Sequence, residues 1–139
     1  MGVYEQWNNL TPAEKAVITA LTLRNPAAPL IIKNSKDVAF NETTAKFGYN
    51  GRNDKSDAFR HCFWSATLAR DLGYFEAKMF TNAHETNPDN PPDEKAMDLH
   101  NNSVGLNIGL YYFIPDYNKA LSDKCNKALQ NGELKVIAP

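Results

Sequence analysis

The chain is organised around one stretch of sequence, DAFRHCFWSATLARDL at residues 57–72, whose apolar spacing predicts a helix. At 100° per residue, the polar residues Asp57 and His61 share one face with Trp64, and apolar side chains cover most of the other side. A helix that is apolar nearly all round is expected at the centre of a fold. Asp57 and His61 would therefore lie at one end of a buried rod.

The rest of the chain is also helical in its periodicity, with no internal repeats and no low-complexity segment. Thr11-Pro12 followed by Glu14 is typical of a helix start, in which Thr11 is the N-cap and Glu14 completes a capping box. Start, stop and spacing signals predict helices at residues 12–24, 29–40, 57–72, 74–86, 93–112 and 116–131, with a shorter one at 42–47. We expect a single all-α domain over residues 1–139, a compact bundle of five to six helices with a short extended C-terminal tail.

Length and composition are those of an ordinary globular protein. A chain of 139 residues can bury a core without metal or disulfides to hold it together. Its net charge of −1 gives no strong footprint for nucleic-acid binding, and no apolar run is long enough for a transmembrane segment. The first residues lack the pattern of a signal peptide. The two cysteines, Cys62 and Cys125, are too few for a disulfide framework and are expected to be small buried residues.

All three histidines fall within residues 57–105, and each lies close in sequence to a carboxylate. The pairs are Asp57 with His61, His84 with Glu85, and Asp98 with His100. Asp57 and His61 are four residues apart and can meet on a helix surface, so that the carboxylate orients the imidazole. Scattered surface histidines would not gather in this way, and we interpret the three motifs as one site.

Each motif also has a purely structural interpretation. His61 could be a satisfied histidine of the core, and His84 could lie at a helix C-terminus, where the helix dipole favours it. Arg60 could clamp a phosphate or carboxylate of a substrate, or it could pair with Asp57 or Asp71 and brace the helix. The sequence leaves these alternatives open.

A stripe of short polar residues and glycines marks the helix predicted at 93–112. Within an arc of about 100° lie Asp98, Asn101, Asn102, Gly105 and Gly109. Each glycine costs a helix about 1 kcal/mol, so the close approach of another helix or of a ligand is expected to compensate. Consecutive asparagines also lower helix propensity. We expect them to bind a ligand or to close a buried hydrogen-bond network.

These residue types favour a hydrolase with a site of histidines and carboxylates. The candidate ligands of a divalent metal, zinc or manganese, are His61, His84, Asp98 and His100. The catalytic candidates are His61, His84, Glu85 and Arg60, and the substrate-binding candidates are Arg60, Asn101 and Asn102, with Asp57 orienting His61. A phosphoester or phospholipid substrate is favoured, because a metal and an arginine match the charge that develops on a phosphate.

Two other hypotheses remain open. In one, His61 and His84 act as general base and acid without a metal while Arg60 stabilises the anion, as in a metal-independent nuclease. In the other, the chain is a non-enzymatic binding domain whose polar motifs form a buried hydrogen-bond network. A zinc protease of the His-Glu-x-x-His type is disfavoured, because no second histidine follows His84 at the required spacing.

Three motifs also resemble a small domain family. DAFRHxxWS at residues 57–65, AHExNP at 83–88 and MDLHNNxxG at 97–105 are similar to domains at the C-termini of bacterial wall-associated, Rhs-like and polymorphic-toxin proteins. The resemblance implies a toxin-like effector domain that acts between cells and is opposed by an immunity protein. Because the first residues lack a signal pattern, the protein is expected to be cytoplasmic until a signal-independent secretion system exports it, or to leave the cell as a piece of something larger. The resemblance assigns neither a reaction nor an oligomeric state.

Overall fold

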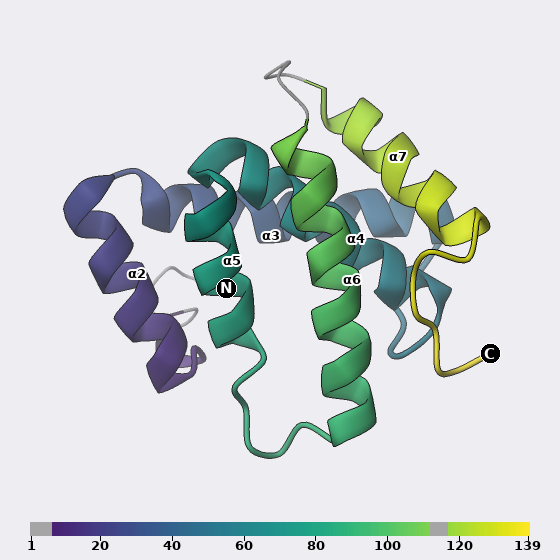
Figure 1. Ribbon diagram of the computed structural model, residues 1–139, viewed down its shortest axis with the longest axis horizontal. Coiled ribbons are helices and arrows are strands. Elements are labelled where there is room, and N and C mark those ends of the chain that lie inside the picture. Colours follow the sequence, from purple (N-terminus) through teal and green to yellow (C-terminus); the bar gives the residue numbers. More distant parts are fainter. Residues whose placement is uncertain (1–6, 112–116) are drawn as a thin grey trace.

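The computed structural model describes residues 7–111 and 117–139, and these residues contain six helices (Figure 1). The helices are α2 (Pro12–Arg24), α3 (Ala28–Phe47), α4 (Lys55–Leu72), α5 (Tyr74–His84), α6 (Pro92–Leu110) and α7 (Asn118–Gln130). The described residues contain no strand, which confirms the all-α fold class. After α7 the chain continues without helix as an extended tail, as predicted. Among these helices, none combines the length and the apolar character needed to cross a membrane.

Helix α4 is the hub of the bundle and contacts α3, α5, α6 and α7. In Figure 1, α6 crosses in front of it. The large apolar side chains Phe59, Phe63 and Leu68 of α4 are completely buried. The predicted central role of this stretch is confirmed, because a helix with apolar residues on all sides needs neighbours on all sides to remove that surface from water.

Two glycines allow α6 to pack directly against the backbone of α4. A Cβ atom added at Gly105 would lie 2.1 Å from the carbonyl oxygen of Cys62, and one added at Gly109 would lie 2.3 Å from that of Ala66. A side chain at either position would therefore clash with helical backbone, which cannot move aside as a flexible side chain could. The close approach that the sequence predicts is made by a helix and not by a ligand.

Helix α3 is longer than the sequence predicts. The prediction ends one helix before Asn41 and places a separate short helix at 42–47, but α3 continues without interruption from Ala28 to Phe47. Ala39 and Thr43 are buried on either side of this position, and α3 packs along α4. Asparagine disfavours helix only by tenths of a kcal/mol (about 0.7 at most) relative to alanine, so tertiary packing outweighs the local preference.

The remaining helix bounds agree closely with the predictions. Thr11 and Glu14 form the predicted capping box at the start of α2. Asp54 is the N-cap of α4, and its side chain accepts a hydrogen bond from the backbone N–H of Asp57. α5 ends at His84, before the predicted end, and the predicted first residue of the last helix, Asp116, lies outside the described residues.

The C-terminal tail is fastened to α6 and to the loop before α4. The Asn101 amide accepts a hydrogen bond from the Lys135 backbone N–H at 2.8 Å and donates one to the Lys135 carbonyl at 2.9 Å. Nε2 of His100 lies 2.8 Å from the carbonyl oxygen of Glu133. Two backbone N–H groups near the end of the tail donate to the carbonyl oxygen of Asn53. The tail therefore buttresses the loop that leads into α4.

Candidate functional site

Asp57, His61 and Asp98 meet where the first turns of α4 and α6 pack together. Nε2 of His61 lies 3.4 Å from Oδ1 of Asp57 and 3.4 Å from Oδ1 of Asp98. One potential ligand atom from each residue lies within 4.8 Å of the other two, an arrangement that could hold a metal ion. Helix spacing alone unites Asp57 with His61, whereas the packing of α6 against α4 adds Asp98.

The orientation of His61 is set by Asn102. Nδ1 of His61 lies 3.0 Å from the amide oxygen of Asn102, which also accepts a hydrogen bond from the Ser65 hydroxyl. The amide nitrogen of Asn102 faces the Glu85 carboxylate at 3.5 Å, so the amide oxygen is directed at the imidazole. Since an amide oxygen can only accept, Nδ1 donates. Nε2 of His61 is therefore the nitrogen that faces the two aspartates.

The two aspartates differ in how their oxygens are satisfied. Asp57 accepts a hydrogen bond from the backbone N–H of Asn53 at 2.7 Å and another from Arg60 at 2.5 Å. By contrast, Oδ1 of Asp98 is buried and has no hydrogen-bond partner among the described residues. An unpartnered buried carboxylate oxygen is costly, and in a native protein such an atom calls for an explanation, for example a catalytic role or a bound ion. Oδ1 of Asp98 is thus an acceptor with room for a proton or a cation.

Burial and mutual charge perturb the pKa of each of these groups. For His61, burial opposes the charged form, but the hydrogen bond to Asp57 and the charge of Asp98 outweigh it, so the pKa of His61 is raised. Burial raises the pKa of Asp98, and the nearby Asp57 charge adds to the effect against the opposing influence of His61. Burial would also raise the pKa of Asp57, but its contacts with His61, Asn53 and Arg60 lower it. Asp57 therefore favours its negatively charged form. Asp98 and His61 both favour their protonated forms, so either can take up a proton that lies between them.

Arg60 braces the entry to α4. Its guanidinium donates to the carboxylate of Asp57, to the Gly51 carbonyl at 3.1 Å and to the Asn50 side chain at 3.2 Å. Three of its five N–H donors therefore contact protein acceptors. The sequence leaves open whether Arg60 binds a substrate or pairs with Asp57 or Asp71. In the structure Arg60 pairs with Asp57, while Asp71 pairs with the neighbouring Arg70.

His84 lies across from His61 and has a carboxylate partner of its own. Its Nδ1 is 2.9 Å from Oε2 of Glu14, the residue whose other carboxylate oxygen completes the capping box of α2. The His84 ring also contacts the Trp64 indole, with ring centroids 5.1 Å apart. His84 is half-buried and is not one of the three clustered residues. It forms a second, separately oriented imidazole beside the cluster.

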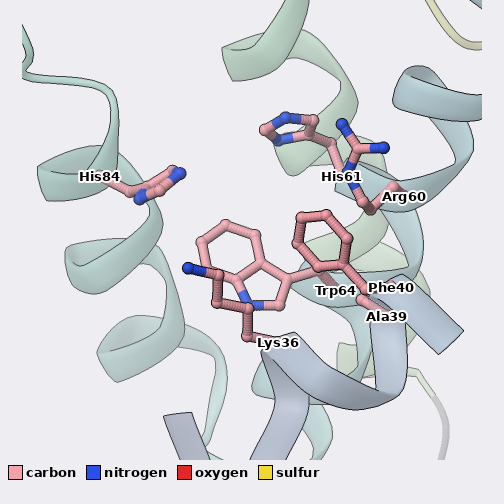
Figure 2. Close-up of a pocket in the computed structure, with 7 residues that line it drawn as sticks. All are labelled: Lys36, Ala39, Phe40, Arg60, His61, Trp64 and His84. Carbon is pink, nitrogen blue, oxygen red and sulfur yellow. The ribbon is translucent and has the colours of Figure 1, made fainter. Parts of the chain in front are cut away.

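Two adjoining depressions lie beside these groups and share Arg60, His61 and His84. The larger depression, of about 560 Å³, is lined by the aspartates of the cluster and by Glu85, whose pKa burial raises. The smaller one, of about 220 Å³, lies between α3, α4 and α5. In Figure 2 the two imidazoles lie on opposite sides of it, with the Trp64 indole between them. Its lining residues are Lys36, Ala39, Phe40, Arg60, His61, Trp64 and His84.

The structure separates the candidate residues of the sequence into two groups. Brought together around the depressions are Asp57, Arg60, His61, His84, Glu85, Asp98 and Asn102. His100 and Asn101 are not part of this arrangement, because both hydrogen-bond the C-terminal tail. His100 lies about 200° around α6 from Asp98, which places the two side chains on nearly opposite faces. The contacts of His100 and Asn101 therefore match a purely structural role, in which they hold the C-terminal tail.

Sequence reasoning missed Glu14, Glu94 and the roles of Phe40 and Trp64, which line the smaller depression. Glu14 is buried, and the sequence predicts only that it caps a helix. A buried carboxylate has two oxygens, and the second one also needs a hydrogen-bond partner. Glu94 is buried at the rim of the polar depression and pairs with Arg52 through two contacts of 2.8 and 2.9 Å. No local signal identifies these partners, because they are far apart in sequence.

A protein-family comparison covers most of the chain. The family described as a domain of unknown function (DUF6973) matches residues 19–133. The chain belongs to this family. The DUF6973 region includes all of α4, α5 and α6, and with them the cluster of Asp57, His61 and Asp98, whereas Glu14 precedes it. No solved structure matches the chain.

Proposed function

We propose that this DUF6973 domain is a hydrolase that uses a divalent cation bound by Asp57, His61 and Asp98. The observation that carries the proposal is the position of Nε2 of His61, 3.4 Å from a carboxylate oxygen on each side. Nδ1 donates to Asn102, so in the neutral imidazole the lone pair of Nε2 faces two negatively charged groups. That arrangement is repulsive unless a cation occupies the space between the three groups.

The distances suit a small metal ion. Ligands bound at about 2.05 Å in a tetrahedral site lie about 3.3 Å from one another. Nε2 of His61 lies 3.4 Å from an oxygen of each aspartate, and one potential ligand atom of Asp57 and one of Asp98 lie within 4.8 Å of each other. One imidazole and two carboxylates are a ligand set that zinc or manganese accepts. Three protein ligands leave a position for water, which is the pattern of catalytic rather than structural zinc sites. The orphaned oxygen of Asp98 gains a partner when the ion binds.

The surrounding groups supply what hydrolysis of a phosphoester needs. A divalent cation would lower the pKa of bound water and stabilise charge on the phosphate. Glu85 is buried beside Asn102 with a raised pKa, which suits a general acid or base. His84 faces the same space from the opposite side, and its contact with Glu14 fixes the ring. Asn102 orients His61, and its amide also lies beside Glu85.

The resemblance to domains of wall-associated, Rhs-like and polymorphic-toxin proteins supports an effector role. Under this proposal the domain is a toxin of bacterial competition that is secreted by a signal-independent route. An immunity protein would then protect the producing cell, and the open depression beside His61 is the surface it would have to block. The substrate is a phosphoester or phospholipid of the target cell.

Metal analysis of the purified protein tests the proposal. We expect about one zinc or manganese ion per chain, and hydrolysis of bis(p-nitrophenyl) phosphate that a chelator abolishes and added metal restores. Asp98→Asn should lose the metal and lower hydrolysis at least 100-fold, since it removes one of three ligands. Asp71→Asn is the matched control, because it changes a carboxylate at the other end of α4. A protein that hydrolyses the ester equally well in chelator would contradict the metal site.

A second candidate needs no metal and is favoured by the raised pKa of His61. In it, a proton on Nε2 takes the place of the cation and is shared with Asp57 and Asp98. His61 then acts as an acid and His84 as the partner base, as in a metal-independent nuclease. Chelator-resistant hydrolysis that is lost in His84→Ala would favour this candidate over the metal site.

A further inference from the structure

We propose that the smaller depression is a subsite for the organic group of the substrate, and that it accepts a single planar ring. The proposal rests on the proposed function, since it takes the scissile phosphate to lie at His61. The two depressions share Arg60, His61 and His84, so a phosphate placed between the imidazoles has its substituent directed into one of them. The carboxylate-lined side suits the cation, which leaves the aromatic side for the organic group.

Aromatic side chains form the walls of this subsite. Trp64 is buried in α4, and its indole contacts both imidazoles, with ring centroids 6.3 Å from His61 and 5.1 Å from His84. Phe40 stands beside it in Figure 2 and is 41% exposed, so part of its ring is open to a ligand. Aromatic rings stack on such walls more favourably than alkyl chains of similar area.

The charge of the subsite suits an anionic ester. Its lining contains Lys36 and Arg60 together with the two histidines, and none of its lining residues is acidic. The guanidinium carbon of Arg60 lies 4.9 Å from the centre of the Phe40 ring, so cation and aromatic wall are adjacent. A ligand that combines negative charge with an aromatic ring satisfies both features at once.

The volume of the subsite limits the size of the group that it can hold. A volume of about 220 Å³ is below the ~300–1,000 Å³ of pockets that enclose whole drug-sized ligands, so the subsite takes one part of the substrate. One ring fits this description better than a long acyl chain.

Trp64 itself can report the binding. The chain has two tryptophans, so Trp7→Phe leaves Trp64 as the single tryptophan, whose fluorescence reports binding. We would titrate this variant with phenyl phosphate, butyl phosphate and inorganic phosphate in chelator, which makes the result independent of any metal. We expect phenyl phosphate to bind at least tenfold more tightly than the other two. Phe40→Ala should weaken it about fivefold, whereas Leu30→Ala, an exposed residue of the same helix, should not.

Each outcome decides the proposal. Equal binding of phenyl and inorganic phosphate would overturn the subsite, and equal binding of phenyl and butyl phosphate would overturn its preference for a ring. A loss of affinity in Leu30→Ala as large as that in Phe40→Ala would show that Phe40 does not contact the ligand. If the protein binds no metal and hydrolyses no ester but still prefers phenyl phosphate, the proposed function fails while the subsite stands.

A separate observation concerns the two cysteines, and we infer that they form a disulfide bond when the chain folds in an oxidising compartment. Cys62 of α4 and Cys125 of α7 are 63 residues apart in sequence, completely buried, and placed with their sulfur atoms 2.6 Å apart. A disulfide bond is about 2.05 Å long, so the two sulfur atoms need to approach by only about 0.5 Å to form it. The sequence predicts buried cysteines correctly but gives no sign that the two meet.

The bond forms by exchange with a small-molecule disulfide such as oxidised glutathione. One cysteine thiolate attacks it and releases one glutathione thiolate, and the second cysteine thiolate then attacks the mixed disulfide and releases the other. The two cysteines lose two electrons and two protons, and the oxidant becomes two thiols. Burial, together with the neighbouring Cys62, raises the pKa of the Cys125 thiol, so exchange is expected during folding and not in the folded protein.

Oxidative refolding tests this cross-link. The unfolded chain is refolded with reduced and oxidised glutathione, and its thiols are then alkylated in denaturant and counted by intact mass. We expect no alkylated cysteine and an unfolding midpoint roughly 10 °C above that of the protein refolded in reductant. Cys125→Ala controls for unspecific effects of the oxidant and should show no such difference. Two alkylated cysteines after oxidative refolding would overturn the inference.

Discussion

At the scale of single residues, Asp98 is a member of the cluster that lowers the stability of the fold, because one of its buried oxygens is left without a hydrogen bond in the described part of the chain. Its buried oxygen lies beside His61 and has no hydrogen-bond partner among the described residues. The sequence offered Asp98 and His100 as equal candidates because they are two residues apart in one motif. They point in directions about 200° apart, and only the contact of α6 with α4 decides which of them reaches His61. Motif proximity therefore could not predict the membership of the cluster.

Glu14 provides a residue-scale prediction that depends on pH. Burial would raise the pKa of Glu14, but its contacts with His84 and the Thr11 N–H outweigh burial and lower it below the ordinary 4.5. A carboxylate whose pKa is lowered in the folded state stabilises the fold above pH 4.5, and this contribution is lost as the pH falls through the lowered value. We expect Glu14→Gln to reduce the free energy of unfolding by about 1–2 kcal/mol at pH 7 and by less below pH 4.5.

Urea denaturation at a series of pH values measures this difference. Glu133→Gln, an exposed glutamate of the tail, is the matched control and should leave the stability unchanged at each pH. A loss in Glu14→Gln that stays constant from pH 7 to pH 4 would mean that the charge of Glu14 contributes nothing, and that only its packing matters.

At the scale of helices, the contact between α4 and α6 positions the whole cluster. The sequence predicts both helices and the glycine face of α6, because glycine in a helix demands a compensating contact. It does not predict the partner, since the contact joins residues some forty positions apart in the chain. The same limit explains α3, where burial against α4 carries the helix through Asn41.

Substitution of Gly105 tests this helix contact. Gly105→Ala gains about 1 kcal/mol of helix propensity, but its Cβ would lie 2.1 Å from the Cys62 carbonyl oxygen. Because backbone atoms meet it, we expect a net loss of about 2 kcal/mol or more in the free energy of unfolding, together with weaker metal binding as α6 shifts. Ser103→Ala, on the exposed face of α6, should change neither. A Gly105→Ala protein as stable as the parent would mean that the two helices can separate freely.

At the scale of the whole molecule, the fold class follows from periodicity, while the site follows from packing. Every helix has a local signal, so the all-α bundle and its central helix at 57–72 are predictable from sequence. The site takes Asp57 and His61 from one predicted motif, Asp98 from another, and Glu14 from a capping box that reads as purely structural. Asn101 belongs to the same polar stripe as Asn102 but holds the tail. Tertiary contacts alone decide which polar residue of this stripe faces the cluster.

Expression in a bacterial host tests the effector proposal on the whole molecule. We expect the chain to arrest growth when it is directed either to the cytoplasm or to the periplasm, lowering colony counts at least 100-fold in the compartment that holds its substrate. Asp98→Asn should restore growth, because it removes a ligand of the proposed cation while the fold stays intact. Asp71→Asn should remain toxic, since this carboxylate pairs with Arg70 away from the cluster.

The two compartments also distinguish the hypotheses for the site. Toxicity confined to the cytoplasm points to an intracellular phosphoester, whereas toxicity confined to the periplasm points to a substrate of the envelope, where the disulfide of Cys62 and Cys125 would also form. Normal growth in both compartments, with folded protein present at high level, would contradict the effector role. A folded Asp98→Asn protein that remains as toxic as the parent would separate toxicity from the cluster and leave the non-enzymatic binding domain as the better account.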